Sequence, residues 1–304
     1  MRAVTGGFVV GGFTDHHVHL QLVDAAALAD SVLGRVVDLG GDPNVLASVA
    51  HNSGVLTRTW PVGAEPAPVR ENSPELYADS GVDVAYAGAF LTPPGGYPSD
   101  RTWAPDGSVR EIADADAAAS AIDEMKDAGA TLIKIASNNT AGPVFSDELF
   151  TLIVGLAASC ELPVVAHAEG PGEAQRAVRL GAARLAHAPF SEPLTDAEIQ
   201  EQAASAEWVS TLAIHDGDAY AIPVDNVRRF HAAGGALLYG TDMGNGATPI
   251  GLNPREIRAL REAGIDGDGL IGALNPVPSR QLFIPGHSPD PLLARPLTPE
   301  DLEG

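Results

Sequence analysis

The sequence predicts a single-domain α/β fold, a (β/α)8 TIM-type barrel. Eight short runs rich in Val, Leu, Ile and Ala alternate with Ala-rich amphipathic segments, as parallel strands alternate with helices. A length of 304 residues fits one large domain. Polar residues recur where the runs end, the face at which such barrels hold their sites. We expect the barrel core over about 11–280 and a Pro-rich tail over 281–304.

Each expected strand is a short apolar run that ends at a glycine, a proline or a polar residue. Gly11 and Gly12 are expected to form a turn into the first strand, and the tail after Pro285 is expected to contain no strand. The eight strands are expected at 13–20, 35–39, 83–91, 131–136, 163–167, 184–187, 208–212 and 236–242.

The expected helices are amphipathic, and several have a recognisable first or last residue. Ser146 and Thr195 are typical N-terminal caps, and Gly129 is typical of the residue that ends a helix. Prolines within 54–80 exclude a long helix there, so this stretch is expected to be irregular. The helices are expected at 24–33, 44–50, 113–128, 146–159, 173–180, 195–204, 224–233, 254–263 and 269–274.

The composition excludes several classes of partner. The formal net charge of −22 argues against binding to nucleic acid or to an anionic membrane. No run reaches the length of a membrane span, and a single cysteine, Cys160, fits a reducing compartment and is expected to be buried. We therefore expect a cytoplasmic protein, with a homo-oligomer as an open alternative. The scarcity of lysine, present only as Lys126 and Lys134, fits either salt adaptation or genome composition.

The stretch 13–20 carries the first candidate metal ligands. His17 and His19 are two residues apart in an expected strand, so their side chains point to the same face and can bind one metal ion together. His16 alternates away from that face and is expected to be structural. Two alternatives are a surface strand with titrating histidines and a remnant of an expression tag. The apolar neighbours of these histidines disfavour both.

Further residues able to bind metal lie at the ends of later expected strands. Lys134 lies in the fourth strand, and Asp242 ends the eighth. A single histidine at the end of a strand is more often a core residue than a ligand, and 240–242 also fits a simple turn. Six such residues in this strand order are improbable by chance. We therefore predict a metal site that contains His17, His19, Lys134, His167, His187 and Asp242.

The segment 12–19, Gly-Phe-Thr-Asp-His-His-Val-His, resembles the first-strand signature of the amidohydrolase superfamily. The segment 275–280 is similar to the helix that follows the barrel in the imidazolonepropionase-like and Xaa-Pro-dipeptidase-like branch. The β-sandwich of most relatives is expected to be absent or only vestigial here, and Tyr97 stands where relatives often have histidine. Further segments similar to that branch are 37–41, 92–97, 133–135, 166–170 and 240–242.

The resemblance implies a binuclear metal-dependent hydrolase that cleaves a C–N amide-type bond of a small molecule. It places His17, His19 and Asp242 on one ion, and His167 with His187 on the other. Imidazole and carboxylate ligands suit Zn²⁺, with Mn²⁺, Co²⁺ or Ni²⁺ as alternatives. A hydroxide that bridges two ions about 4 Å apart would attack the carbonyl, and Asp242 would pass its proton to the leaving nitrogen.

Lys134 lies between Ile133 and Ile135 in a strand that is expected to be buried. A buried unpaired ammonium is costly, so its pKa should fall, and the neutral amine can add CO₂. The resulting carbamate has two oxygens that can bridge two cations, which is the role that the resemblance implies for this position. The alternatives are a lysine paired with a carboxylate and a lysine whose ammonium reaches solvent.

Weaker candidates for contact with a substrate follow other strands. Tyr97, Asn138 and His215 follow the third, fourth and seventh expected strands. Glu169 follows the fifth, and a loop carboxylate is an equally good interpretation of it; an exposed loop histidine is the favoured interpretation of His215. The histidines expected to be exposed on helices or in the tail are His51, His231 and His287.

Three other functions stay open at this point. A lactonase or a phosphotriesterase would use the same pair of ions. A mononuclear deaminase or imidazolone-type ring hydrolase would use Glu169 as its proton carrier. A non-catalytic metal-binding protein is disfavoured, because all six ligand positions hold residues able to bind metal.

Overall fold

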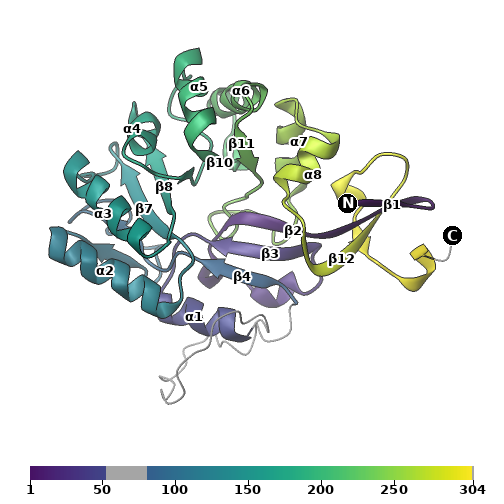
Figure 1. Ribbon diagram of the computed structural model, residues 1–304, viewed down its shortest axis with the longest axis horizontal. Helices are drawn as coiled ribbons and strands as arrows, with labels where there is room; N and C mark the ends of the chain where they lie inside the picture. The colour runs from purple at the N-terminus through teal and green to yellow at the C-terminus, as the bar shows by residue number, and fades with distance from the viewer. Residues whose placement is uncertain (53–80, 303–304) are drawn as a thin grey trace.

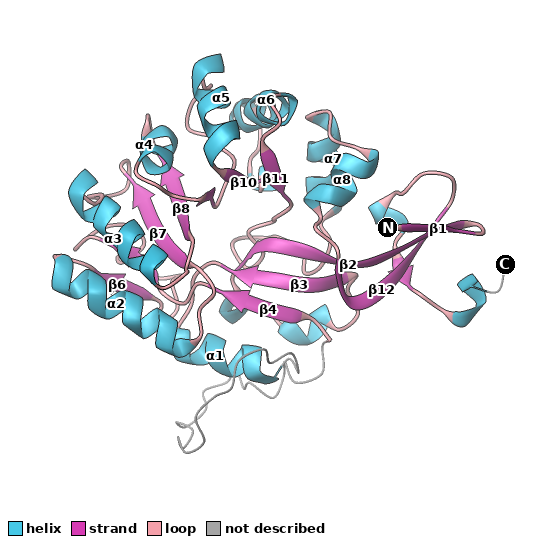
Figure 2. Ribbon diagram, viewed as in Figure 1, coloured by secondary structure: helices cyan, strands magenta, loops and turns pink. Residues whose placement is uncertain are grey.

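The computed structural model describes residues 1–52 and 81–302, and in it eight strand positions form a barrel with helices on the outside (Figures 1 and 2). The expected TIM-type barrel is confirmed. The expected irregular stretch 54–80 lies outside the described residues. The eight positions are β2 (Gly7–Val18), β3 (Leu33–Asp38), β4 with β5 (Asp83–Tyr86 and Phe90–Thr92), β7 (Ile133–Asn138), β8 (Val164–Glu169), β9 (Arg184–Leu185), β10 (Glu207–Val209) and β11 (Ala236–Leu238).

The barrel is built from two sheets that meet at two seams. Parallel pairing runs through β2, β3 and β4, and separately from β5 through β7, β8, β9 and β10 to β11. At one seam the chain itself passes from β4 into β5. At the other, the segment after β11 pairs with β2: Met243 bridges Val18, the His16 backbone N donates to Tyr239 O at 2.9 Å, and His19 N donates to Met243 O at 2.7 Å. The ends of strands one and eight are therefore held side by side.

The third strand is bent, and the single strand expected at 83–91 is wrong in this respect. Gly88 has a φ of +76°, and a Cβ there would lie 2.4 Å from Met125 Sδ of a covering helix. The chain therefore turns at Gly88, so that β4 pairs with β3 and β5 pairs with β7. An unpredicted strand, β6 (Val109–Glu111), pairs with the free side of β5.

Most helices begin and end close to the expected residues. Ser146 and Thr195 cap their helices through the side chain, and Gly129 ends its helix with a φ of +91°. One helix begins at Asp218 with Pro223 inside it, whereas the sequence predicted a start after that proline. The helices are α1 (Pro43–Asn52), α2 (Ala115–Ala128), α3 (Asp147–Ser159), α4 (Glu173–Arg179), α5 (Asp196–Ser205), α6 (Asp218–Ala232), α7 (Pro254–Glu262) and α8 (Gly267–Ala273).

The helix expected at 24–33 is wrong. Two short 3₁₀ turns, η1 (Leu20–Leu22) and η2 (Ala25–Leu28), occupy this stretch, and β3 already begins at Leu33. Asp24 caps the second turn by accepting a hydrogen bond from Ala26 N at 3.1 Å. An aspartate that bonds the backbone two residues on favours a turn over a continuous helix.

An antiparallel extension projects from the barrel, on the right of Figure 2, and corrects three expectations. Gly11 and Gly12 form no turn, because β2 runs through them; a Cβ on Gly11 would lie 2.3 Å from Val277 O of a neighbouring strand. The helix expected at 275–280 is replaced by a strand, and strands continue into the tail. The extension consists of β1 (Arg2–Val4), the first half of β2, β12 (Val277–Pro285) and β13 (Arg295–Pro296).

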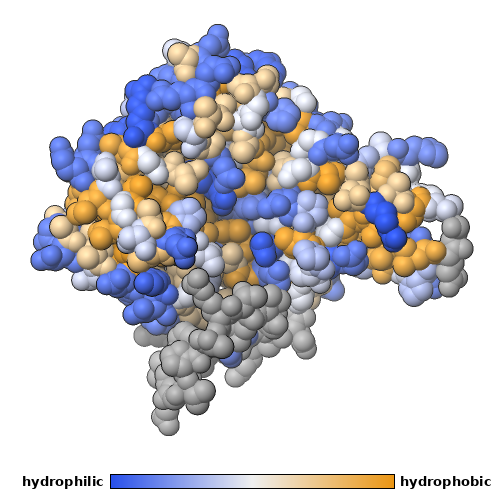
Figure 3. Space-filling view, viewed as in Figure 1, coloured by the Kyte–Doolittle hydropathy of each residue, from blue (hydrophilic) through white to orange (hydrophobic). Residues whose placement is uncertain are grey.

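Apolar side chains fill the space between the strands and the covering helices. Trp208 of β10 stacks on Phe230 of α6, with ring centroids 3.8 Å apart. Cys160 is half-buried at the end of α3 rather than fully buried. The surface view shows apolar side chains gathered over the extension (Figure 3). Leu292 and Leu293, in the segment between β12 and β13, are exposed. Within residues 1–52 and 81–302, the helices are too short or too polar to cross a membrane.

Candidate metal centre

All six predicted ligands line one cavity of about 900 Å³ at the ends of the barrel strands. They lie in, or up to four residues after, strands one, four, five, six and eight, so residues far apart in sequence meet at this cavity. Each of the six residues is at most 8% exposed. The structure thus brings the six predicted residues together. That they bind metal stays a prediction.

Backbone carbonyls orient the two histidines of strand one. His17 Nδ1 lies 2.8 Å from Ala186 O, and His19 Nδ1 lies 3.1 Å from Gly40 O. A carbonyl only accepts, so each Nδ1 carries the hydrogen and donates it. In the neutral imidazole the Nε2 atom then has a free lone pair, which is the form that binds metal.

Asp242 presents one carboxylate oxygen to both histidines. Its Oδ1 lies 3.2 Å from His17 Nε2 and 3.2 Å from His19 Nε2, and has no hydrogen-bond partner among the described residues. Its Oδ2 accepts a hydrogen bond from Asn245 Nδ2 at 2.9 Å. Asp242 has a φ of +56°, an uncommon backbone conformation that turns this side chain into the cavity.

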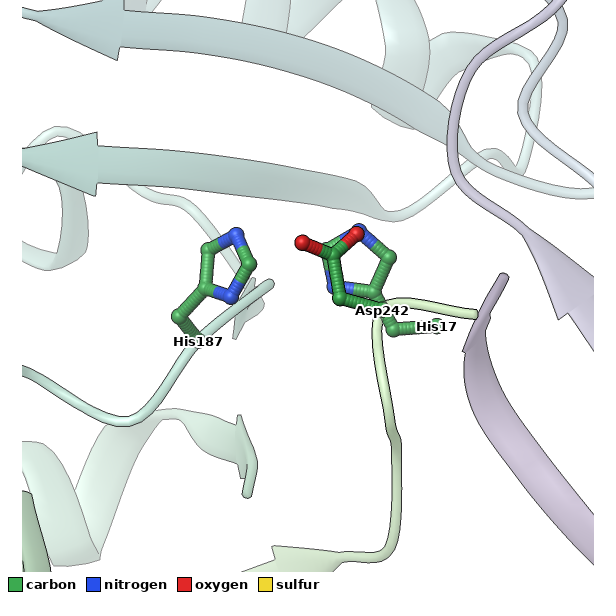
Figure 4. Close-up of side chains that lie close together, drawn as sticks. All are labelled: His17, His187 and Asp242. Carbon is green, nitrogen blue, oxygen red and sulfur yellow. The ribbon is translucent and has the colours of Figure 1, made fainter. Parts of the chain in front are cut away.

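The fifth and sixth strands add two more imidazoles. His187 Nδ1 lies 2.9 Å from the hydroxyl of Thr211, and atoms of His17, His187 and Asp242 able to bind a metal lie within 4.8 Å of one another (Figure 4). The ring of His167 lies 5.0 Å from that of His187, but its Nε2 faces Glu169 Oε2 at 3.1 Å. His167 therefore borders the converging cluster without belonging to it.

The charges of this cluster fit a bound cation. Burial holds the pKa of His17 and of His187 well below the ordinary value, so both imidazoles are neutral. Burial alone would raise the pKa of Asp242, but His17 and His19 outweigh it and hold that pKa well below its ordinary range. Burial likewise opposes protonation of His19, yet the carboxylate of Asp242 raises the pKa of this imidazole. The neutral imidazoles of His17 and His187 and the ionised carboxylate of Asp242 therefore present lone pairs to one another, the arrangement that a divalent cation relieves.

Lys134 lies beside this cluster in β7 and is 1% exposed. Burial lowers its pKa to about 7, although Asp242 and Asp38 act in the opposite direction. Among the described residues, no carboxylate lies within ion-pair distance of its Nζ, which lies 6.0 Å from the centre of the Phe90 ring. Neither alternative for this lysine, a close ion pair or access to solvent, is found.

Asp15 positions two of the strands that carry candidate ligands. In the sequence it stands out only as part of the first-strand signature. It is fully buried, and burial raises its pKa to about 7 against the effect of its hydrogen bonds. Its carboxylate accepts hydrogen bonds from His17 N at 3.0 Å, Thr241 N at 3.1 Å and Thr241 Oγ1 at 2.6 Å. It therefore joins the residue before Asp242 to the strand that carries His17.

We expect Asp15→Ala to lower the free energy of unfolding by about 3 kcal/mol, because three buried donors lose their acceptor. Urea unfolding in the presence of chelator measures this effect without a contribution from metal. Asp24→Ala is the matched control, since Asp24 makes an exposed capping bond to Ala26 N and is expected to cost less than about 1 kcal/mol. Equal losses in the two variants would contradict the role of Asp15.

The weaker candidates divide into two groups. Tyr97, Glu169 and His215 line the cavity, and Phe190 packs between the rings of His187 and His215. Asn138 is not among the lining residues: its amide donates to Glu169 Oε2 at 2.7 Å, so it positions that carboxylate rather than contacting the cavity.

The remaining histidines lie where the sequence predicted. His16 points away from the cavity, and burial lowers its pKa to about 3. Sequence reasoning missed several lining residues: Phe90 lies in β5, and the others come from loops and from α7, whose pattern does not show which side chains face a cavity. The exposed histidines are His51, His231 and His287, and the lining residues missed are Phe90, Trp103, Phe190, Asn245, Arg255 and Arg258.

Comparison with known proteins finds similarity only in structure. No protein-family model matches the sequence, and no curated protein sequence matches it significantly. A Xaa-Pro dipeptidase with methionine in its active site superposes with a TM-score of 0.69 at 16% identity, covering 93% of this chain and 82% of its own.

Two other solved structures are similar to this chain over nearly its whole length. An amidohydrolase superposes with a TM-score of 0.65 at 17% identity over 95% of this chain and 82% of its own. The ochratoxinase of A. niger gives 0.64 at 14% identity over 92% of this chain and 77% of its own. The chain has the barrel fold of these amidohydrolase-superfamily structures.

Proposed function

We propose that the protein is a metal-dependent amidohydrolase that cleaves a C–N amide-type bond of a small molecule. One observation carries the proposal: the buried Oδ1 of Asp242 faces two imidazole nitrogens at 3.2 Å and has no hydrogen-bond partner among the described residues. These atoms lie in a cavity large enough for a small molecule. The similar structures named a dipeptidase and an amidohydrolase support hydrolysis of a C–N bond.

Two divalent ions, with zinc as the first choice, are part of the proposal. His17, His19 and Asp242 would hold one ion, and His167 with His187 the other, with Lys134 between them. When bound, such ions lower the pKa of water and polarise a carbonyl oxygen. For His167 to join, its Nε2 must leave Glu169, which now lies 3.1 Å away.

Asp242 is the proposed proton carrier. Asn245 occupies its Oδ2, so Oδ1 is the atom that accepts the proton as water attacks the carbonyl carbon. The O–H bond of the water breaks, its oxygen bonds to the carbon, and Oδ1 then gives the proton to the nitrogen as the C–N bond breaks. The products are a carboxylic acid and an amine.

Lys134 is proposed to carry a carbamate. Its deprotonated amine would attack CO₂ to form an N–C bond with loss of one proton, which replaces a buried cation by an anion with two oxygens. The support is that Lys134 is buried beside the cluster without a carboxylate at ion-pair distance among the described residues.

A second candidate is a mononuclear deaminase or imidazolone-type ring hydrolase. The observation that favours it is the contact between His167 and Glu169, since Asn138 holds this carboxylate at the cavity wall as a proton carrier would require. The hydrogen bond from His167 holds the pKa of Glu169 below its ordinary value, so it is ionised as a base must be. The converging cluster of His17, His187 and Asp242 would then bind a single ion.

Metal content per chain, measured after purification without chelator, separates these candidates. Two ions per chain support the binuclear hydrolase, and one ion supports the second candidate. Side-by-side assays on an N-acyl amino acid, a lactone and an aryl phosphotriester then test the reaction. Turnover confined to the lactone or the phosphotriester would overturn the proposed amidohydrolase, and the absence of both metal and turnover would leave a non-catalytic protein.

The loops around the mouth of the cavity are proposed to bind the substrate rather than to take part in the chemistry. Tyr97 is half-buried with its ring 5.2 Å from that of His167, and the ring of His215 lies 4.7 Å from that of Phe190. We expect Tyr97→Ala and His215→Ala to raise KM by about tenfold, the loss of one good contact, while kcat changes less. Steady-state kinetics measure the split, and unchanged kinetics in both variants would exclude these loops from the pocket wall.

We also propose that the enzyme is cytoplasmic, because its single cysteine fits a reducing compartment. Its acidic composition supports a small-molecule substrate without nucleic-acid or membrane partners. Fractionation of cells that produce the protein tests the location. Size-exclusion chromatography with light scattering tests whether it forms the homo-oligomer left open above.

A further inference from the structure

Glu256 of α7 is a fully buried carboxylate that has no role in the chemistry proposed above. Its two oxygens accept hydrogen bonds from two consecutive backbone groups that follow strand seven. Oε1 accepts from Leu212 N at 3.0 Å, and Oε2 accepts from Ala213 N at 2.6 Å. Hydrogen bonds from backbone N–H groups to a buried carboxylate are strong, so this pair fixes the stretch after strand seven to the helix.

The helix is itself anchored beside this stretch, so Glu256 is held in place. Asn253 caps α7 through its side chain, and its backbone N donates to Tyr239 Oη at 2.7 Å, in the segment that follows β11. One residue before Glu256, Arg255 Nη2 donates to His215 O at 2.6 Å. The helix is therefore a fixed support for the segment after strand seven.

Thr211, the residue just before this segment, has a strained backbone. Its φ of +43° lies in the left-handed region, which is unfavourable for a β-branched residue. It directly precedes the 3₁₀ turn η4 (Leu212–Ile214), and its own N donates to Gly240 O at 3.1 Å. Such strain persists only where the surroundings impose the conformation. The bonds from Glu256 to the next two residues supply this constraint.

The strained conformation places the hydroxyl of Thr211 against a candidate metal ligand. Thr211 Oγ1 lies 2.9 Å from His187 Nδ1, and both residues are buried. The other edge of the His187 ring faces Asp242 (Figure 4). A hydroxyl that accepts the hydrogen of Nδ1 leaves the lone pair of the neutral ring on Nε2, which is the form that binds a metal.

We propose that Glu256 is a positioning residue for His187 and acts through the left-handed backbone of Thr211. The carboxylate holds the two N–H groups that follow Thr211 and so keeps this residue in its strained conformation. The hydroxyl of Thr211 then fixes the ring orientation and the tautomer of His187. The inference rests on the proposed metal centre, and Glu256 takes no part in substrate binding or proton transfer.

Zinc affinity, measured by competition with a chelating dye, is the first readout. Burial raises the pKa of Glu256 to about 7, so the measurement is made at pH 8, where most of this carboxylate is ionised. Glu256→Gln replaces one acceptor by an amide group that cannot accept, and Thr211→Val keeps the shape but removes the hydroxyl. Each should weaken zinc binding about tenfold, since loss of a residue that orients a ligand costs about 10–100-fold in metal affinity. Thr211→Ser, which keeps the hydroxyl, should bind zinc like the native protein.

The double variant tests whether the two residues act in one chain of contacts. If Glu256 acts through Thr211, zinc should bind to Glu256→Gln/Thr211→Val as tightly as to Thr211→Val alone. Losses that multiply, or native affinity in Glu256→Gln, would overturn the proposal. If Glu256→Gln does not fold, Glu256→Asp replaces it, because the shorter side chain cannot reach both N–H groups.

Glu262→Gln is the matched control. Glu262 belongs to the same helix and accepts a hydrogen bond from Tyr220 Oη at 2.7 Å, but it is exposed. This variant should bind zinc with native affinity, and a loss equal to that of Glu256→Gln would contradict the proposal.

The second readout needs no metal. Nitrogen-15 NMR of the chelator-treated protein shows which ring nitrogen of His187 carries the hydrogen, once the signal is assigned by its loss in His187→Gln. Native protein and Thr211→Ser should carry it on Nδ1, whereas Glu256→Gln and Thr211→Val should show a mixture of tautomers. The same tautomer in all four proteins would overturn the proposal. A native protein that binds no zinc would instead overturn the proposed function, and the tautomers would still decide the role of Glu256.

Discussion

Asp242→Asn is expected to lower kcat by about 10³-fold while the protein stays folded, since one positioned proton carrier contributes about 10²–10⁴-fold. An asparagine has the same shape, but its side chain cannot take a proton from water. With its one oxygen toward the histidines, its amide nitrogen faces Asn245, whose own amide must flip to accept a hydrogen bond from it. The remaining oxygen of residue 242 still ligates, so much of the metal should stay bound.

The measurement combines kcat, metal content and the unfolding midpoint of the same preparation. Asp123→Asn is the matched control, because Asp123 is exposed on α2, and its turnover should equal that of the native protein. Activity of Asp242→Asn near the native level would exclude the proton-carrier role. Loss of all metal would instead show that Asp242 acts mainly as a ligand.

Lys134→Ala is expected to yield a folded protein with little metal and no detectable turnover. The substitution removes the amine that carries the proposed carbamate, and with it the anion shared by two cations. Lys126→Ala is a control offered by the chain itself, because the only other lysine is exposed on α2 and should have no effect on metal content. Metal analysis and activity of the two variants are compared directly.

Restoring the activity of Lys134→Ala with added carboxylic acids is the more specific test of the carbamate. Short carboxylic acids such as acetate or propionate fit the space left by the lysine side chain and supply two oxygens. They should restore part of the metal content and turnover of Lys134→Ala, and bicarbonate should speed metal uptake by the native protein. A native protein with both ions bound and an unmodified amine, detected by its mass under native conditions, would refute the carbamate.

The barrel and the predicted ligand set follow from local patterns in the sequence. Apolar runs with polar ends are enough to order the strands, and His17 and His19 share a face because strand residues alternate. Asp242 was found because it ends an expected strand, although its left-handed backbone has no sequence signal beyond Gly240, two residues earlier. The periodicity of apolar residues in the sequence therefore identifies site residues that lie in or next to regular strands and helices.

Other features depend on contacts between distant residues, which periodicity does not report. Gly11 was interpreted as a turn because glycine is common there, whereas its purpose is the close approach of Val277. Gly88 bends strand three because Met125 leaves no room for a side chain. Arg258 lies on an amphipathic helix whose pattern does not distinguish an arginine beside a cavity from one in solvent.

Strand β2 belongs to the antiparallel extension in its first half and to the barrel in its second half. Its pairing partners include β12, from Val277 to Pro285, so the strand that carries His17 and leads into His19 is completed only by residues about 270 positions later. A growing chain on the ribosome therefore cannot finish this centre until nearly all of it has emerged. The proposed metal ions would consequently bind late in synthesis, and prematurely terminated products would lack a formed site.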